Sequence, residues 1–379
     1  MIQPLVALDV GTTKVACAIG LPHERSSGFE LVGSSVIPYP VLTEAWLADP
    51  LLVGRTIEQA LEATQVRGDF HRALVTMTHP ALISEQARVV MTLADEPLTV
   101  RSQDLERLQT QAVNQVLGVD RDPLMVEPVA FAGNGFDGVR DPRGLAATRL
   151  AGTYHIVTIP MSARRALVQA VESAGLEVAR LTYTLPALWA SVADEPLRSK
   201  RVLLIDVGGL TTDLGLFIEG SLQRTASLPW GGVILAAMIA KTFQVTMDQA
   251  VTWSRDGTAA GHREDVRAFI EHQWDAIAKA LGRLRKGEPR PDAILVAGRG
   301  ALMDGLAEWI EHTTDIPTVL GRSGRTSTLS DLSSQVALGA AIGMLELATR
   351  TPSALATFRS PHLLNRLLDR TRTILTEYF

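Results

Sequence analysis

Two stretches of the chain share one pattern of apolar and polar positions. The first, at residues 5–20, reads L-V-A-L-D-V-G-T-T-K-V-A-C-A-I-G, and the second, at residues 203–215, reads L-L-I-D-V-G-G-L-T-T-D-L-G. In each stretch an apolar run ends at an aspartate, a glycine-containing turn follows, and apolar residues then resume. The pattern predicts a buried strand, a tight turn and a second strand in both places.

The turns of both stretches carry residue types that bind a phosphate. Backbone N–H groups in a glycine turn point outward toward phosphate oxygens, threonine hydroxyls add donors, and a neighbouring carboxylate holds a hydrated Mg²⁺ ion. Lys14 adds positive charge to the first turn. A single such turn is typical of an ordinary hairpin, but two copies about half a chain apart indicate two similar halves that face a shared cleft.

The remaining pattern predicts alternating strands and helices, which is typical of an α/β protein. In the first half we expect strands at 29–37, 73–77, 86–93, 125–132, 154–159 and 177–183, and helices at 51–63, 102–117, 162–174 and from about 186. Ser102 is the expected cap of the second helix, and residues 133–144 are expected to form a turn-rich loop. In the second half we expect helices from about 233, at 247–254 and at 263–284.

A third glycine-bearing segment follows these helices. Residues 292–305 read D-A-I-L-V-A-G-R-G-A-L-M-D-G, which predicts a buried strand, a glycine turn and a helix. Glycines in such a turn let a flat ligand such as a nucleoside approach the backbone closely. An ordinary strand-to-helix turn has the same local pattern, so this alternative stays open.

Composition narrows the class of protein. With 379 residues, of which 46% are hydrophobic and 20% charged, the chain is long and apolar enough for two folded domains. The net charge of −5 argues against a nucleic-acid partner. The single cysteine, Cys17, excludes disulfides within the chain and indicates a reducing cytoplasm. No signal-peptide pattern is present and the longest apolar run, at 336–345, is too short to span a bilayer, so we expect a soluble or peripheral protein.

The order of first hairpin, second hairpin and glycine-bearing turn resembles the actin and Hsp70 ATPase superfamily. Three further segments are similar to the FtsA family of bacterial cell-division proteins: D-G-V-R-D-P-R-G-L at 137–145, T-Y-H-I-V-T at 153–158 and A-L-V-Q-A-V-E-S-A-G-L-E-V at 166–178. The resemblance runs from Leu5 to about Leu347. It implies an α/β fold of actin-like, RNase H-like duplicated domains around a nucleotide cleft, with a small α/β insertion in the first half and a C-terminal amphipathic helix.

The resemblance also implies domain boundaries. The expected parts are a first half at 1–83 and 153–200, an inserted subdomain at 84–152, a second half at 201–348 with an outer subdomain at about 244–290, a linker at 349–360, and an amphipathic helix at 361–379. Helical spacing places one set of apolar residues on the membrane-binding face of that helix: Leu364, Leu367, Leu368, Leu375, Tyr378 and Phe379. The alternative is a terminal helix docked on the protein's own core.

The implied cofactors are ATP and Mg²⁺, held in the cleft. The residues assigned to the nucleotide are Asp9, Gly11, Thr12, Thr13, Lys14, Asp206, Gly208, Gly209, Thr211, Thr212, Gly231, Gly232, Gly298 and Gly300. Asp9 and Asp206 are expected to hold the metal through water. No side chain stands in a recognisable water-activating position, and His79 and His155 are interpreted as structural. At most a weak ATPase is expected.

The chain departs from the family pattern in its nucleotide contacts. Leu210 replaces a third glycine of the second turn, and Arg299 stands among the glycines of the last turn. Val251 and Ser254 occupy positions where the family offers a glutamate and a lysine to the ribose and adenine. These departures put the strength of nucleotide binding in doubt, while the fold is unaffected.

The partners implied by the resemblance are the C-terminal tail of FtsZ, further copies of the chain in filaments, inner-membrane lipid and other division proteins. The protein would act as a peripheral protein on the cytoplasmic face of the membrane at the division site. The outer subdomain is shorter than in the family. It carries basic residues that would attract an acidic tail: Arg283, Arg285, Lys286 and Arg290. The alternative is that these residues only form the solvated end of a helix. The insertion is expected to form part of the filament contact. Alternative readings are a PilM-like pilus-assembly scaffold and a small-molecule kinase of the superfamily.

Overall fold

A computed structural model describes residues 3–24, 27–39, 49–256, 264–327, 329 and 331–350. The predicted amphipathic helix at 361–379 and its assigned membrane-binding residues lie outside these ranges. Of the predicted linker, only Thr349 and Arg350 are described, and they form the end of a helix. Within the described ranges, no helix has the length and apolar character needed to cross a bilayer.

The first half is built on a five-stranded sheet in the order β11-β4-β1-β2-β3. Its strands are β1 (Leu5–Val10), β2 (Lys14–Pro22), β3 (Phe29–Pro38), β4 (Arg72–Met77) and β11 (Glu177–Tyr183). The first three form an antiparallel meander, and β4 lies parallel to both β1 and β11. Its helices are α1 (Pro50–Ala63), α3 (Met161–Ser173), α4 (Thr184–Val192) and α5 (Glu195–Arg198).

The second half repeats this topology, with the order β14-β13-β12-β15-β16. Its strands are β12 (Arg201–Val207), β13 (Thr212–Ile218), β14 (Ser221–Leu228), β15 (Ala293–Ala297) and β16 (Thr318–Leu320). The helical elements are α6 (Gly232–Phe243), α7 (Met247–Arg255), α8 (Glu264–Leu284), η2 (Arg299–Leu302), α9 (Leu306–Thr314), η3 (Gly324–Thr326), α10 (Leu332–Ala337) and α11 (Gly339–Arg350). The duplication predicted from the two hairpins is therefore present in the fold.

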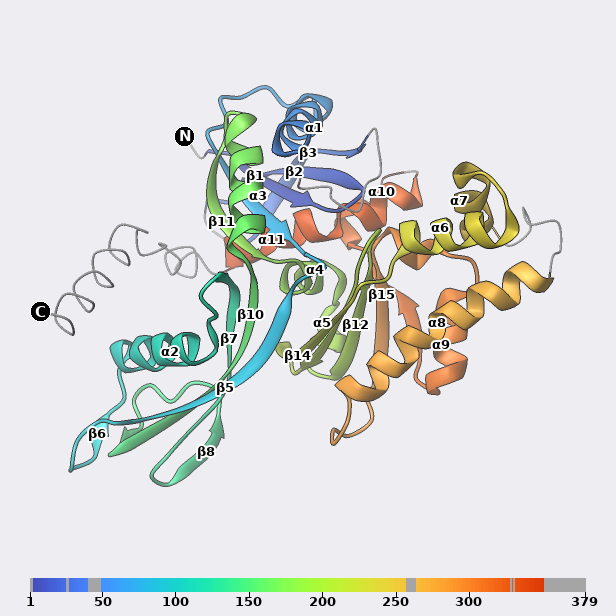
Figure 1. Ribbon diagram of the computed structural model, residues 1–379. Coiled ribbons are helices and arrows are strands. Elements are labelled where there is room, and N and C mark those ends of the chain that lie inside the picture. The colour runs from blue at the N-terminus through green and yellow to red at the C-terminus, as the bar shows by residue number, and fades with distance from the viewer. Residues whose placement is uncertain are drawn as a thin grey trace, which may run out of the picture.

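Helices α4 and α11 cross closely between the two sheets (Figure 1). A Cβ atom on Gly343 of α11 would lie 1.6 Å from the carbonyl oxygen of Ala187 in α4, so only glycine fits there. Nearby, the Ser191 hydroxyl donates to the carbonyl of Gly339 at 2.6 Å. Because α11 also packs on β1, β2 and β4, it fixes the second half's C-terminal end against the first sheet.

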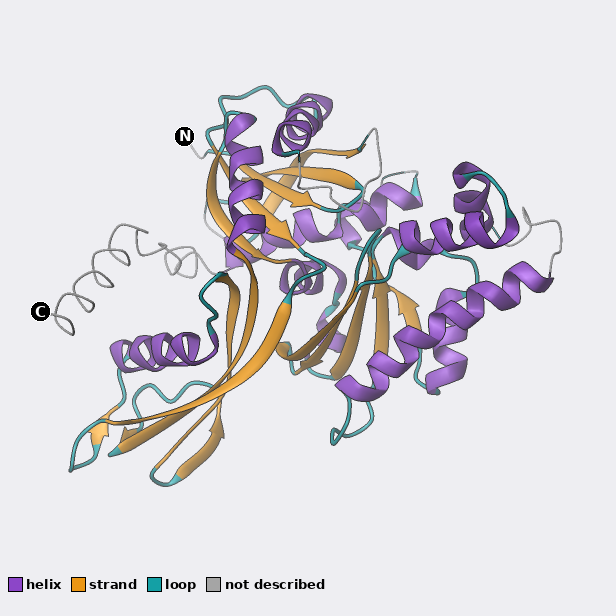
Figure 2. Ribbon diagram, viewed as in Figure 1, coloured by secondary structure: helices purple, strands orange, loops and turns teal. Residues whose placement is uncertain are grey.

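The insertion forms a separate lobe with its own sheet, in the order β5-β10-β7-β8 (Figure 2). It comprises β5 (Ile83–Thr92), β6 (Leu98–Thr99), α2 (Ser102–Val116), β7 (Arg121–Gly133), β8 (Phe136–Val139), β9 (Ala146–Ala147) and β10 (Arg149–Pro160). Helix α2 covers this sheet, and the rings of Phe131 and Tyr154 meet edge-on beneath it with centroids 5.8 Å apart. The lobe therefore has an apolar core of its own.

Two local predictions in the insertion were wrong. Ser102 is the first residue of α2 rather than its cap, and the cap position belongs to Arg101, whose backbone N–H donates to the Asp104 carboxylate at 2.9 Å. The acidic residue in the first turn thus satisfies the backbone N–H of the cap residue, which is the other half of a capping box. The predicted loop at 133–144 contains the short strand β8, which pairs with the end of β7 through a bulge.

The insertion also docks on β14, the edge strand of the second sheet. The Ser84 hydroxyl donates to the Thr225 carbonyl at 3.0 Å, and the Gln86 amide donates to the Gln223 carbonyl at 2.9 Å. His155 lies buried at this contact, with Nε2 3.0 Å from the Thr225 hydroxyl, and burial lowers its pKa to about 4. A neutral imidazole packed between two sheets agrees with the structural role predicted for His155.

Candidate functional site

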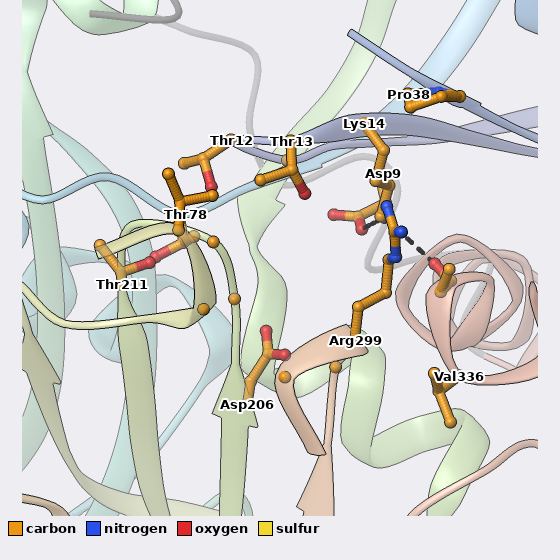
Figure 3. Close-up of a pocket in the computed structure, with 18 of the residues that line it drawn as sticks. Asp9, Thr12, Thr13, Lys14, Pro38, Thr78, Asp206, Thr211, Arg299 and Val336 are labelled. Atoms are coloured by element: carbon orange, nitrogen blue, oxygen red, sulfur yellow. Dashed lines mark hydrogen bonds and ion pairs between the residues drawn. The ribbon is translucent and has the colours of Figure 1, made fainter. Parts of the chain in front are cut away.

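A cleft of about 340 Å³ opens between the two halves where the hairpin turns face each other (Figure 3). The predicted residues that line it are Asp9, Gly11, Thr12, Thr13, Lys14, Asp206, Gly208, Gly209, Thr211, Gly232, Gly298 and Gly300. Thr212 and Gly231 do not line it. The Thr212 hydroxyl donates to the Trp230 carbonyl at 2.9 Å, and a Cβ atom on Gly231 would lie 2.5 Å from the Gly209 carbonyl oxygen. Both residues therefore pack against the second hairpin turn and do not face the cleft.

The two hairpin turns have the same backbone geometry. The N–H of Gly11 donates to the Lys14 carbonyl at 3.0 Å, and the N–H of Gly208 donates to the Thr211 carbonyl at 2.9 Å. Each turn thus closes over four residues directly after the strand that carries its aspartate. This arrangement brings both aspartates and both sets of turn amides to the cleft.

The tips of the two hairpins touch. The backbone N–H of Leu210 donates to the Thr12 hydroxyl at 3.2 Å, while the Leu210 side chain is buried in an apolar cluster built from both halves. A Cβ atom on Gly209 would lie 2.1 Å from the Thr13 methyl carbon, so glycine is needed for the contact. The leucine that replaces a glycine in the family pattern therefore joins the halves, and its amide is already bonded to the opposite hairpin.

Asp9, in the first hairpin, is fully paired within the protein. Its carboxylate forms an ion pair with Lys14 and accepts a hydrogen bond from the Thr76 hydroxyl at 2.9 Å. Lys14 also donates to the Ala337 carbonyl, just before α11, at 3.1 Å. Asp9 and Lys14 are both buried. Through the bond from Lys14 to Ala337, the last residue of α10, this pair connects the first hairpin to α10.

Asp206, in the second hairpin, differs in having no such partner. No hydrogen bond or ion pair joins its carboxylate to any residue within the described ranges, and Asp213 lies directly opposite it on β13. Burial raises the pKa of Asp206 to about 7, and the charges of Asp213 and Asp9 add to this shift while Lys14 opposes it. A carboxylate in this state is stabilised by a cation that enters the cleft.

Asp213, which does not line the cleft itself, is a buried carboxylate beside Asp206 that the sequence analysis did not identify. It is buried and accepts hydrogen bonds from the Thr78 hydroxyl at 2.6 Å and the Tyr183 hydroxyl at 3.0 Å. Burial raises its pKa, and these donors act in the opposite direction. Its signal in the sequence is its place in the hairpin: once the turn is aligned, Asp213 must pair across from Asp206.

The turn after β15 packs against the end of the second hairpin. Gly298 has a φ of 77°, and a Cβ atom there would lie 2.3 Å from the Asp206 carboxylate oxygen Oδ1. A Cβ atom on Gly300 would lie 2.3 Å from a methyl carbon of Val207. Packing on β12 therefore accounts for these two glycines without a ligand. Arg299, between them, extends from the turn toward Lys14 across the cleft (Figure 3).

These groups fit a nucleotide and a hydrated metal ion. The cleft volume is within the range of small-molecule sites. The described residues contain no group of three or more metal-ligating side chains, so an ion here would keep most of its water, as Mg²⁺ commonly does. Asp206 offers the free carboxylate for such an ion, and Arg299 adds positive charge to the same cleft.

Comparisons with known proteins agree with this architecture. The model of the "SHS2 domain inserted in FTSA" matches residues 81–158. Cell division protein FtsA of Pseudomonas aeruginosa is 25% identical over 370 residues, which cover 90% of this chain and 88% of that protein. FtsA of Escherichia coli K12 is 26% identical over 243 residues, which cover 63% of this chain and 57% of that protein.

Solved structures share the whole fold at low sequence identity. A PilM–PilN type IV pilus biogenesis complex matches with a TM-score of 0.68 at 15% identity, covering 92% of this chain and 99% of that one. MreB5 of Spiroplasma citri bound to AMPPNP matches with a TM-score of 0.50 at 12% identity, covering 93% and 98%. The resemblance to FtsA is thereby confirmed: the chain is an actin-like α/β protein that carries the SHS2 insertion found in FtsA.

Proposed function

We propose that the protein binds ATP with Mg²⁺ in the cleft between its halves and acts as an actin-like cell-division protein. The observation that carries the proposal is Asp206, an unpaired carboxylate that lies beside two phosphate-type turns. The relatives named as cell division protein FtsA support the cellular role, and the MreB5 structure bound to AMPPNP supports the ligand. No residue of the cleft is assigned to water activation, so any ATP hydrolysis is expected to be slow.

The proposal extends to the partners implied by the resemblance. The protein would form filaments with a contribution from the insertion, join the FtsZ tail to the membrane, and recruit other division proteins. A surface hollow lined by Arg285, Lys286 and Arg290 is our candidate site for the acidic tail. Arg290 in the same hollow pairs with Asp315 at 3.0 Å, so part of the hollow's positive charge is already balanced.

The segment at 361–379 is proposed to bind the cytoplasmic face of the membrane at the division site. Its apolar residues would insert into the lipid interface only partly, so one copy would bind weakly. Filaments would multiply these contacts by raising their effective concentration. Membrane attachment and assembly are therefore proposed to be coupled.

A pilus scaffold is the competing function, because the PilM–PilN complex shares the fold over almost its whole length. The match to the FtsA insertion and the similarity to FtsA over most of the chain favour cell division. Capture of partners from the native cytoplasm separates the two: recovery of the tubulin-like division protein supports the first, and recovery of pilus components supports the second.

Calorimetry on the intact chain tests the nucleotide site. We expect ATP to bind in the presence of Mg²⁺, and we expect Asp206→Asn to abolish the dependence on Mg²⁺ because the free carboxylate is lost. Asp95→Asn is the matched control, since Asp95 is exposed in the insertion. If the unmodified protein binds no adenine nucleotide at millimolar concentration with Mg²⁺ present, the proposed site is wrong.

A further inference from the structure

Arg299 is a cation in the cleft that has no hydrogen-bond or ion-pair partner among the described residues. Its side chain leaves η2 and extends across the cleft toward Lys14 (Figure 3). Its Nε atom is enclosed and makes no hydrogen bond, and no ion pair joins its guanidinium to any residue that the structure describes. Placing such a group in a half-buried site is costly unless an anion compensates it.

Two charges act on the Arg299 guanidinium, those of Arg255 and Asp331. Lys14 is paired with Asp9, and Arg255 adds a second positive charge at the rim of the same cleft. Asp331 acts on Arg299 from a distance, but its carboxylate accepts the N–H groups of Ser333 and Ser334 at 3.1 and 2.9 Å as the cap of α10. The protein therefore leaves the guanidinium available to a ligand.

At the nucleoside end of the cleft, α7 offers few polar groups to a base or a ribose. Val251 of α7 is apolar, and the Ser254 hydroxyl donates inward to the Val251 carbonyl at 2.9 Å. A planar guanidinium, in contrast, matches two phosphate oxygens at once. Resting on the nucleotide site proposed above, we propose that Arg299 binds the phosphate chain of the nucleotide and that the cleft recognises its ligand chiefly through phosphate.

The test compares binding of Mg·ATP, tripolyphosphate and adenosine by calorimetry on the full-length chain. We expect Arg299→Gln to weaken ATP and tripolyphosphate by at least about tenfold and to leave any adenosine binding unchanged, because a charged hydrogen bond is lost. Arg299→Lys keeps the positive charge but not the planar guanidinium, so it should recover part of the lost affinity. Arg55→Gln, on an exposed residue of α1, removes the same net charge outside the cleft and should change nothing.

Two outcomes would overturn this inference while leaving the nucleotide site intact. One is ATP affinity that is the same in Arg299→Gln and in the unmodified protein. The other is tighter ATP binding by Arg299→Gly, which would mean that the side chain occupies the space of the ligand. Failure of the unmodified protein to bind either ATP or tripolyphosphate would instead reject the nucleotide site itself, and this inference with it.

Discussion

The two hairpins that face the cleft share one backbone geometry but differ in charge. When their turns are aligned, Lys14 of the first hairpin corresponds to Thr211 of the second, and Ala16 corresponds to Asp213. The first hairpin therefore balances its aspartate with a lysine, whereas the second sets another carboxylate directly opposite its aspartate. The two copies thus share the geometry of the turn, but the first pairs its aspartate with a cation and the second does not.

This difference indicates which of the two hairpins would bind an added cation. Asp9 already has an ion pair and a hydrogen bond from Thr76, so a metal gains little by replacing them. Asp206 has no such partner among the described residues and has Asp213 as its neighbour, so a divalent ion would reduce the repulsion between two carboxylates there. We expect the first hairpin to hold the cleft together and the second to bind the metal.

The largest expected effect comes from breaking the balance in the first hairpin. Lys14→Met leaves the Asp9 carboxylate buried without its cation, which should lower the free energy of unfolding by about 3–5 kcal/mol. Thr211→Val, at the matching position of the second hairpin, removes one weak hydrogen bond to Asp213 at 3.4 Å and should cost only about 1 kcal/mol. Urea denaturation of both variants measures the difference.

The double variant Asp9→Asn/Lys14→Met tells whether the charge is responsible. Removing both partners leaves no buried charge, so much of the lost stability should return. Equal stability of Lys14→Met and Thr211→Val would mean that the two hairpins do not differ in the way described above.

A smaller effect is expected where the hairpin tips meet. Gly209→Ala places a Cβ atom 2.1 Å from the Thr13 methyl carbon, and relief of this clash should cost about 1–3 kcal/mol. Gly11→Ala, in the first turn, meets its nearest atom at 3.4 Å and should cost less than about 1 kcal/mol. Thr13→Ser removes the clashing methyl group, so it should recover part of the stability lost by Gly209→Ala in thermal unfolding; the Thr12 hydroxyl oxygen, 2.9 Å from the added Cβ atom, accounts for the rest. No rescue would show that the tips are not packed on each other.

The repeated hairpins were predictable because their signals are local. An apolar run, an aspartate and a glycine turn stand next to one another in the chain, and their two copies predicted the duplicated fold. The same is true of the strands and helices around them, whose ends differ from the predictions by a few residues. Local periodicity was enough for these features.

Features that depend on distant residues were not predictable. The docking of the insertion on β14 rests on Ser84 and Gln86, which donate to backbone carbonyls far along the chain, and no pattern marks such contacts. Leu210 looked like a weakened phosphate turn, yet its amide bonds Thr12 of the other half. The predicted end of the insertion, after residue 152, falls within β10, a strand that runs without a break to Pro160.

The smallest expected effect concerns the pH dependence of the second hairpin in metal-free buffer. The pKa of Asp206 is raised in the folded protein to about 7, so at pH 8 the carboxylate is charged in both states, but its charge is unfavourable only in the folded protein. As the pH falls through 7, the folded protein takes up a proton and this destabilisation declines. Asp206→Asn carries no such charge at any pH.

We therefore expect Asp206→Asn to be more stable than the unmodified protein by about 1 kcal/mol at pH 8 with EDTA, or about 2–4 °C in melting temperature. The advantage should shrink toward pH 5, where the unmodified residue is protonated in the folded state. Asp9→Asn is the matched control and should lose stability, because it leaves Lys14 without its carboxylate. If Asp206→Asn loses stability at pH 8 by as much as Asp9→Asn does, both aspartates are paired within the protein and the contrast between the hairpins is wrong.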